Sequence, residues 1–299
     1  MSSPLLGLLR RVNRATRDRP AVRRLGVVGY REAVRVVRFL GPPKVMLNGP
    51  AKSGTHLLSD CLSLLPRMMF SGRHFVPHEF RAGPTTEGEV TPPLDITRLR
   101  RWLDRCPNGM FVTTHAGYQP ELVELWRDLE FRHVLLLRDP RDIVVSFTHY
   151  VTSSPWLKRH AYYSEALSTL DERLMATIRG YDAADGRHLR GIRASLETYL
   201  PWLDREDVLV VRYEDLIGPL GGGTADRQHA TIARVSDFVG RELSEYEIEQ
   251  VAIKMYSRAS LTFRSGQSGE WRSSLSRDHQ RAIEEEAGPV LEALGYGDP

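Results

Sequence analysis

The chain has 299 residues, of which 41% are hydrophobic and 26% charged, with a formal net charge of +3 at pH 7. This is the composition of an ordinary globular protein, and it suits one large α/β domain or two small ones. It excludes a membrane-spanning helix, because no apolar run reaches roughly 18–20 residues, and a disulfide framework, because there are only two cysteines, Cys61 and Cys106. We expect a cytoplasmic protein in which both cysteines are small buried hydrophobes.

The basic charge is concentrated at the start of the chain. Residues 1–40 hold ten arginines against Asp18 and Glu32, and we predict a basic N-terminal extension followed by a single domain over 41–299. The apolar run in this extension is too short for a secretory signal. Two interpretations stay open: peripheral contact with an anionic membrane surface, at the inner face of the membrane, or a solvated helix that packs on the domain.

The most informative stretch is residues 44–65, KVMLNGPAKSGTHLLSDCLSLL. A short apolar run predicts a buried strand over 44–48, and apolar residues near helical spacing predict a helix over 56–65. Between them, glycines and a proline favour a tight loop. Such a loop directs backbone N–H groups and a positive helix end toward one point, which is typical of an anion site. Lys52 adds a full charge, and the chain has only four lysines in all.

The loop differs from an ATP-binding P-loop. Gly49 and Gly54 have the right separation, but Thr55 stands where that motif needs a lysine. The pattern therefore predicts phosphate binding without a magnesium–ATP site.

The remaining elements alternate between strands and helices. Apolar runs predict further buried strands over 109–115, 133–137 and 208–212, and a long irregular segment over 66–93 resembles a substrate-binding lid. Helical spacing predicts helices over 94–105, 120–129, 143–151, 227–239, 244–256 and 277–294, with 155–205 mostly helical and broken near 180–186.

This alternation predicts a three-layer α/β fold. A central, mostly parallel sheet of about four to five strands would be flanked by helices, in a P-loop-like arrangement. Ligands of such sheets bind beyond the carboxyl ends of the strands. We therefore expect Lys52, His115, Arg138 and Tyr213 to lie along one edge.

Four segments together resemble the PAPS-dependent sulfotransferase family, whose members transfer a sulfuryl group from 3′-phosphoadenylyl sulfate (PAPS). AKSGT at 51–55 is similar to the family's 5′-phosphosulfate loop, and RDPRDIVVSF at 138–147 to its 3′-phosphate motif. RYEDL at 212–216 and FRSGQSGEW at 263–271 are similar to two further donor-binding segments. The resemblance covers roughly residues 44–295.

The resemblance implies PAPS as co-substrate, no metal, and roles for particular residues. His115 would be the general base, and Lys52 would stabilise the leaving phosphate. Glu79 is the alternative base, because other branches of the family use a glutamate. The implied donor-binding residues are Lys52, Ser53, Gly54, Thr55, His56, Arg138, Ser146, Tyr213, Arg264, Ser265 and Gly266.

Several positions depart from the cytosolic small-molecule members of the family. Leu57 stands where a tryptophan usually packs on the adenine, and Thr113 where the segment of the catalytic histidine often carries a lysine. Ala51, His56 and Ser265 also differ. These departures shift the expected donor affinity toward Arg138 and Arg264, whose forked guanidinium groups suit a phosphate.

Two other functions remain as alternatives. A nucleotide kinase would use Asp139, at the end of the third strand, as a magnesium ligand. A non-catalytic membrane-surface protein on the same scaffold would use the basic extension. We expect a natural product, glycan or lipid as acceptor and no nucleic acid, because the basic segment lacks interleaved aromatic residues. The sequence leaves the acceptor and the oligomeric state open.

Overall fold

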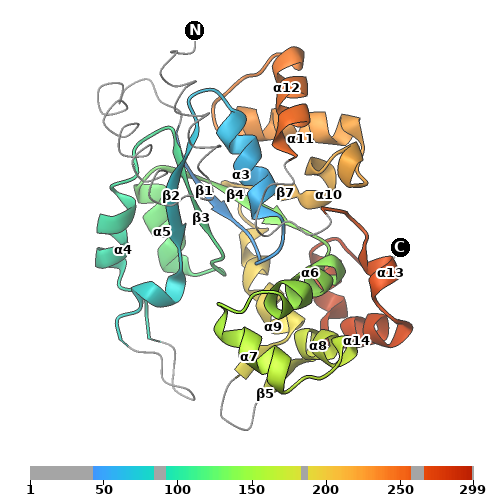
Figure 1. Ribbon diagram of the computed structural model, residues 1–299. Helices are drawn as coiled ribbons and strands as arrows, with labels where there is room; N and C mark the ends of the chain where they lie inside the picture. The colour runs from blue at the N-terminus through green and yellow to red at the C-terminus, as the bar shows by residue number, and fades with distance from the viewer. Residues whose placement is uncertain (1–42, 84–91, 183–187, 257–265, 298–299) are drawn as a thin grey trace.

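The computed structural model describes residues 43–83, 92–182, 188–256 and 266–297. At its centre is a five-stranded sheet in the order β2-β3-β1-β4-β7 (Figure 1). Every neighbouring pair in this sheet is parallel. The strands are β1 (Lys44–Asn48), β2 (Met69–Phe75), β3 (Met110–Thr114), β4 (Phe131–Leu137) and β7 (Val208–Arg212).

The central strands are buried on both faces, which explains their continuous apolar sequences. Val45, Met46 and Leu47 of β1 are fully buried. Because side chains alternate along a strand, Val45 and Leu47 join one apolar cluster and Met46 joins the other. The sheet therefore separates two hydrophobic cores.

Helices complete the two outer layers. One core contains α3 (Thr55–Leu64) and α10 (Tyr213–Leu216), α11 (Ala225–Phe238) and α12 (Glu245–Met255). The other contains residues of α4 (Ile96–Leu103), α5 (Pro120–Asp128), α6 (Pro140–Thr152), α9 (Ile192–Leu196) and α14 (Arg277–Ala293). The three-layer α/β fold predicted from the sequence is confirmed.

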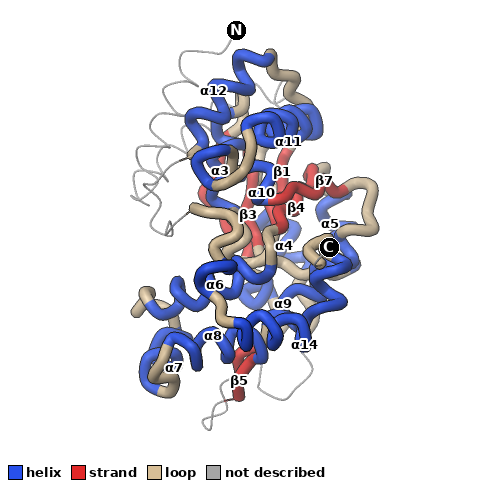
Figure 2. Tube along the Cα trace, turned by 90° about the vertical axis from the view of Figure 1, so that its right-hand side faces the viewer, coloured by secondary structure: helices blue, strands red, loops and turns tan. Residues whose placement is uncertain are grey.

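A helical lobe lies beyond the carboxyl ends of the strands (Figures 1 and 2). It has a small core of its own, with Val151 and Tyr163 at its centre. Its elements are α7 (Lys158–Glu165), α8 (Leu170–Arg179) and a hairpin of β5 (Gly180–Asp182) and β6 (His188–Arg190). Helix α9 and then η2 (Glu197–Trp202) follow the hairpin, and both pack in the larger core. The predicted break near 180–186 coincides with this hairpin.

Local signals in the sequence place several helix ends. Pro120 and Pro140 occupy first helical positions, where a missing N–H costs nothing. Ser244 caps α12 and forms a reciprocal capping box with Glu247. The short segments η1 (Pro77–Phe80), η3 (Pro219–Gly221) and α13 (Trp271–Ser274) complete the described elements.

The prediction of an irregular segment over 66–93 was wrong for its first half. Met69–Phe75 forms the edge strand β2, and η1 follows it. The strand contains Gly72 at a φ of 75° and a shift of register against β3. These irregularities interrupt the alternation by which strands are recognised.

Both cysteines are buried thiols rather than disulfide partners, as predicted. Burial raises the pKa of the Cys61 thiol to about 12, so it stays protonated and inert. Among the described helices, none combines the length and apolar character needed to cross a bilayer. The predicted basic extension over 1–40 lies outside the described residues.

Candidate active site

The loop between β1 and α3 contains two residues with left-handed backbone. Lys52 has a φ of 71° and Gly54 a φ of 97°. For a lysine this conformation costs on the order of 1–2 kcal/mol, and such strain is concentrated at functional sites. The ammonium of Lys52 lies 4.3 Å from the ring centroid of Tyr150 on α6. The loop thus holds its one cation in a strained position against a neighbouring helix.

Helix α3 begins without a side-chain cap. The residue that precedes it is Gly54, which has no side chain with which to cap the helix. The hydroxyl of Ser53 is buried and has no hydrogen-bond partner among the described residues. A buried hydroxyl next to an uncapped helix start fits a bound anion.

Asn48 ties the end of β1 to the end of β3. Its side-chain amide donates to the Ala116 carbonyl at 2.9 Å, and its carbonyl oxygen accepts from Ala116 N–H at 3.1 Å. The same oxygen accepts from the N–H of Gly49. These bonds fix the start of the phosphate loop relative to the residue that precedes Ala116, which is His115.

The imidazole of His115 is oriented by the loop itself. Its Nδ1 lies 2.7 Å from the Gly49 carbonyl oxygen. Because a carbonyl only accepts, Nδ1 carries the proton, and in the neutral ring Nε2 keeps a lone pair. Burial is the main cause that lowers the pKa of His115 to about 4, with the charge of Lys52 acting in the same direction. At neutral pH the ring is an uncharged base.

A second histidine lies beside the first. His74 on β2 contacts His115 edge to face, with ring centroids 5.1 Å apart. Its Nδ1 is 3.0 Å from the hydroxyl of Thr113, and partial burial lowers its pKa as well. Sequence reasoning gave His74 no role, because its strand was taken for part of an irregular segment.

Arg138 follows β4 and connects the phosphate loop with a distant segment. Its guanidinium donates to the carbonyl of Lys52 at 3.4 Å and to that of Gln267 at 2.7 Å. Its side chain is only 8% exposed, and Nε has no partner among the described residues. A buried guanidinium with an unused donor fits an anionic ligand.

Asp142 supports this arrangement from the first turn of α6. Its carboxylate accepts from the N–H groups of Gly269 and Trp271, at 2.7 and 3.0 Å, and lies 3.5 Å from Arg138. Burial raises its pKa, against the opposing effect of Arg138. Segments 138–142 and 266–271, far apart in sequence, therefore meet at one place. The two hydrogen bonds that Asp142 accepts from Gly269 and Trp271 were not predicted from the sequence, because they depend on this contact.

Tyr213 and Gly54 are in close contact. A side-chain carbon on Gly54 would overlap the tyrosine ring, so a glycine is required there for both space and backbone conformation. The Arg138 guanidinium lies over the same tyrosine ring, with its central carbon 4.3 Å from the ring centroid. Lys52, His115, Arg138 and Tyr213 are therefore joined through contacts along one sheet edge, as the topology predicted.

The other residues that the sequence predicted for donor binding lie on α3, on α6 and in the 263–271 motif. Thr55 opens α3 and His56 is exposed on it. Ser146 is half-buried on α6, one turn beyond Asp142. Gly266 begins the described part of the 263–271 motif and has a φ of 63°. Arg264 and Ser265 lie outside the described residues.

Glu79 has a different environment. It is exposed on η1 and lines a cavity of about 370 Å³ with Arg98, Arg101 and Trp102. Its backbone N–H donates to the Val76 carbonyl, which connects η1 to the preceding chain. By contrast, His115 contacts the phosphate loop directly.

Both carboxylate oxygens of Asp139 accept hydrogen bonds from Arg141. Asp139 caps α6 by accepting from Arg141 N–H, and its two carboxylate oxygens pair with the Arg141 guanidinium at 2.9 and 3.0 Å. This leaves it poorly suited as the magnesium ligand of a kinase. Within the described ranges, no cluster of three or more histidine, cysteine or acidic side chains is placed to hold a metal ion.

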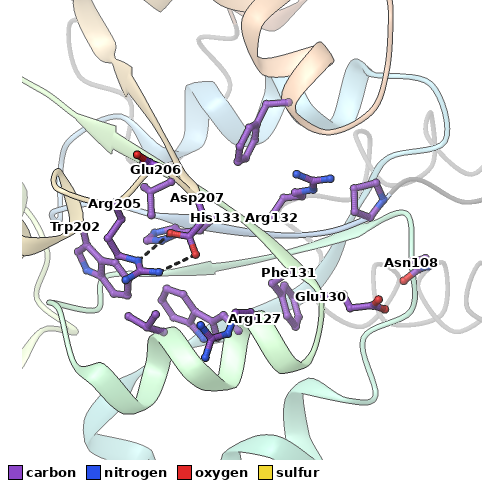
Figure 3. Close-up of a pocket in the computed structure, with 15 residues that line it drawn as sticks. Asn108, Arg127, Glu130, Phe131, Arg132, His133, Trp202, Arg205, Glu206 and Asp207 are labelled. Atoms are coloured by element: carbon purple, nitrogen blue, oxygen red, sulfur yellow. Dashed lines mark hydrogen bonds and ion pairs between the residues drawn. The ribbon is translucent and has the colours of Figure 1, made fainter.

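A separate cavity of about 530 Å³ opens at the other edge of the sheet, by the amino ends of β4 and β7 (Figure 3). There Trp126 and Trp202 stack on each other, and the buried His133 contacts both rings in edge-to-face geometry. Arg205 pairs with Asp207 nearby. Burial lowers the pKa of His133 to about 3. This histidine is remote from the phosphate loop and belongs to the core.

Comparison with known proteins identifies the class to which this fold and site belong. The sulfotransferase domain family matches residues 42–295, and the chain therefore belongs to that family. Mouse sulfotransferase 6B1 is 22% identical over 208 residues, which are 64% of this chain and 61% of that protein. The match thus spans about three fifths of the length of this curated relative.

Two solved structures share the fold at 18% identity. Mouse sulfotransferase SULT7A1, complexed with PAP, has a TM-score of 0.58 over 84% of this chain and 85% of its own. Retinol dehydratase, in complex with androsterone and the inactive cofactor PAP, has a TM-score of 0.51 over 88% and 84%. At this identity the likeness establishes the three-layer fold, and the chemistry has to be argued from the residues.

Proposed function

We propose that this protein is a sulfotransferase that uses PAPS to transfer a sulfuryl group to a hydroxyl of an acceptor molecule. The observation that carries the proposal is the position of Arg138, which contacts both the Lys52 carbonyl of the phosphate loop and the Gln267 carbonyl of the 266–271 segment. Two anion-binding segments joined by one buried arginine suit a donor with phosphates at both ends.

The 5′-phosphosulfate end of the donor would bind at the start of α3. The first-turn N–H groups and the Ser53 hydroxyl supply hydrogen bonds, and Lys52 supplies charge. The proposed residues are Lys52, Ser53, Gly54, Thr55 and His56. The 3′-phosphate would bind Arg138 and Ser146 with Arg264, Ser265 and Gly266, and Tyr213 would flank the nucleoside.

His115 is the proposed general base. Its neutral ring, held through Nδ1, offers Nε2 to the proton of the acceptor hydroxyl. The hydroxyl oxygen bonds to sulfur as the bond between sulfur and the bridging phosphate oxygen breaks, and the proton passes to His115. Lys52 stabilises the negative charge that forms on that phosphate oxygen. Glu79 remains the alternative base. It is the weaker candidate, because it lines the cavity beside Arg98, whereas His115 contacts the phosphate loop.

The acceptor would be a small molecule, a glycan or a lipid. The retinol dehydratase structure contains androsterone, which shows that this fold accommodates a small molecule beside PAP. We also propose a single domain over 41–299, in the cytoplasm, with the extension over 1–40 as a peripheral membrane contact. Binding to anionic vesicles that disappears on removal of residues 1–40 would support that contact, and equal binding by the truncated protein would exclude it.

Calorimetric titration tests the proposed donor. We expect tight, metal-independent binding of PAP, weak binding of ATP with magnesium, and a loss of PAP affinity of at least about a hundredfold in Arg138→Ala. Arg100→Ala, which removes an exposed ion pair with Asp128, is the matched control and should bind PAP normally. A preference for magnesium–ATP would favour a kinase. Binding of neither nucleotide would favour a scaffold without sulfotransferase chemistry.

A further inference from the structure

The segment 294–297, which follows α14, contacts the ends of β4 and β7, the strands that lead into Arg138 and Tyr213. Gly295 turns the chain there with a φ of 75°. A side-chain carbon on Gly295 would come within 2.6 Å of the Arg212 guanidinium. The segment therefore fits closely against the end of β7.

Three hydrogen bonds hold the 294–297 segment in place. Arg212, at the end of β7, donates to the Leu294 carbonyl at 2.7 Å, and Arg141 on α6 donates to the Tyr296 carbonyl at 3.1 Å. The Tyr296 hydroxyl donates to one carboxylate oxygen of Glu214 at 2.8 Å. The Arg212 guanidinium also lies over the Tyr296 ring, with 4.7 Å between its central carbon and the ring centroid. All three partners are close neighbours in sequence of proposed donor-binding residues.

The carboxylate of Glu214 connects Tyr296 to the proposed donor site. Its other oxygen accepts from the N–H of Asp139 at 2.9 Å. Asp139 immediately follows Arg138, and Glu214 immediately follows Tyr213. One carboxylate therefore ties together the two chain segments that present the arginine and the tyrosine ring, and the Tyr296 hydroxyl holds that carboxylate.

The Tyr296 hydroxyl also compensates the partly buried charge of Glu214. Burial raises the pKa of Glu214, whereas the hydrogen bonds from Asp139 and Tyr296 and the charge of Arg138 lower it. A carboxylate oxygen that loses its donor in such a place is costly, and it would be attracted to Arg138. Because Nε of Arg138 has no partner among the described residues, an oxygen released by Tyr296 would compete with a bound phosphate for this guanidinium.

We propose that Tyr296 is a positioning residue of the donor site, which acts through Glu214 to keep Arg138 in place for the 3′-phosphate. The inference rests on the proposed function, because it takes PAPS as the donor and Arg138 as the residue that binds its 3′-phosphate. Tyr296 lies just beyond residues 42–295, which match the family. The donor site thus includes a side chain outside the matched domain.

Calorimetric titration of the full chain with PAP tests the proposal. Tyr296→Phe removes only the hydroxyl and leaves the ring beside Arg212. Tyr246→Phe, at a tyrosine of α12 that is 69% exposed, is the matched control. Arg138→Ala and the double variant Arg138→Ala/Tyr296→Phe complete a double-mutant cycle, which isolates the effects that pass through Arg138.

We expect Tyr296→Phe to weaken PAP binding about tenfold, the effect of one hydrogen bond to a charged group, and Tyr246→Phe to leave it unchanged. In the Arg138→Ala background, Tyr296→Phe should change PAP affinity by less than about threefold. A merely structural role of Tyr296 predicts equal losses in both backgrounds. Equal losses, or an unchanged affinity in Tyr296→Phe, would overturn the proposal.

Thermal unfolding shows whether each variant is folded at the temperature of the titration. Gly295→Ala gives a second variant, because it pushes Arg212 away from its bond to the Leu294 carbonyl. It should also weaken PAP binding in the native background and much less in Arg138→Ala, and equal losses there would count against the proposal. If the unsubstituted protein does not bind PAP, the proposed function itself is refuted.

Discussion

The guanidinium of Arg138 lies over the ring of Tyr213, with 4.3 Å between its central carbon and the ring centroid. Arg138 follows β4 and Tyr213 follows β7, so the pair joins the ends of two neighbouring strands. The contact keeps the guanidinium oriented while its Nε remains available. It also places the tyrosine ring against Gly54, so one pair connects the two proposed phosphate sites.

Substitution of Gly54 should affect stability and donor binding together. Gly54→Ala forces a left-handed backbone on alanine and an overlap with Tyr213, and we expect a loss of about 1–3 kcal/mol in the free energy of unfolding. Urea denaturation measures this. In the double variant Gly54→Ala/Tyr213→Ala the overlap is removed and the backbone strain remains, so Tyr213→Ala should cost less when combined with Gly54→Ala than alone. Additive effects would contradict the overlap.

Removal of the loop cation should slow catalysis more than it weakens binding. In Lys52→Met the charge on the leaving phosphate loses its stabilising partner, and we expect kcat to fall by about a hundredfold or more while the Kd of PAP rises by less. Steady-state rates and calorimetry give the two values. Lys254→Met, on α12, is the matched control for the loss of one lysine. A variant with normal kcat and weak PAP binding would assign Lys52 to binding alone.

The proposed base should titrate well below the usual range of histidine. Because the pKa of His115 is lowered to about 4, its ring signal should have a titration midpoint near pH 4 in NMR. The base is active when deprotonated, so protonation of His115 should not reduce kcat between pH 8 and 5.5. A base with a pKa of about 6.5 would lose about tenfold at pH 5.5. A tenfold loss of kcat at pH 5.5, with PAP binding unchanged at that pH, would contradict the assignment of His115 as the base.

Protein stability should fall in acid because of buried histidines. His133 has a pKa of about 3 in the fold and about 6.5 when unfolded, so between these values the unfolded chain binds a proton that the folded chain does not. Stability is therefore full above about pH 6.5 and declines as the pH falls toward 3, by a few kcal/mol for this group. His115 acts in the same direction.

Denaturant titrations at several pH values measure this decline. His133→Phe keeps an aromatic ring against the stacked pair of Trp126 and Trp202 and should reduce the dependence on pH, whereas His78→Phe, at an exposed site, should leave it unchanged. An unaltered dependence in His133→Phe would show that His133 is hydrated or charged in the fold.

The sequence predicted the parts of the fold that local patterns encode. The apolar runs of β1 and β7 gave strands with their observed bounds, because strands buried on both faces are continuous and apolar. The order of strands and helices then placed Lys52, His115, Arg138 and Tyr213 on one edge. The family motifs identified the same residues independently.

Features that depend on distant contacts were not predictable. The edge strand β2 pairs on one side only and is broken by Gly72, so its sequence lacks a strand pattern, and His74 was given no role. In the sequence, Asp142 looks like any acidic residue in the first turn of a helix. Only the fold brings it to the N–H groups of Gly269 and Trp271, which lie far along the chain.

The carbonyl of Gly49 connects the proposed base to the backbone of the donor loop. It accepts from His115 at 2.7 Å and from the Tyr199 hydroxyl at 3.5 Å, so the base is attached to the backbone of the donor loop rather than to the elements on the acceptor side. Under the proposed function, any shift of this loop would move the donor and the base together, so the alignment of the two does not depend on which acceptor is bound.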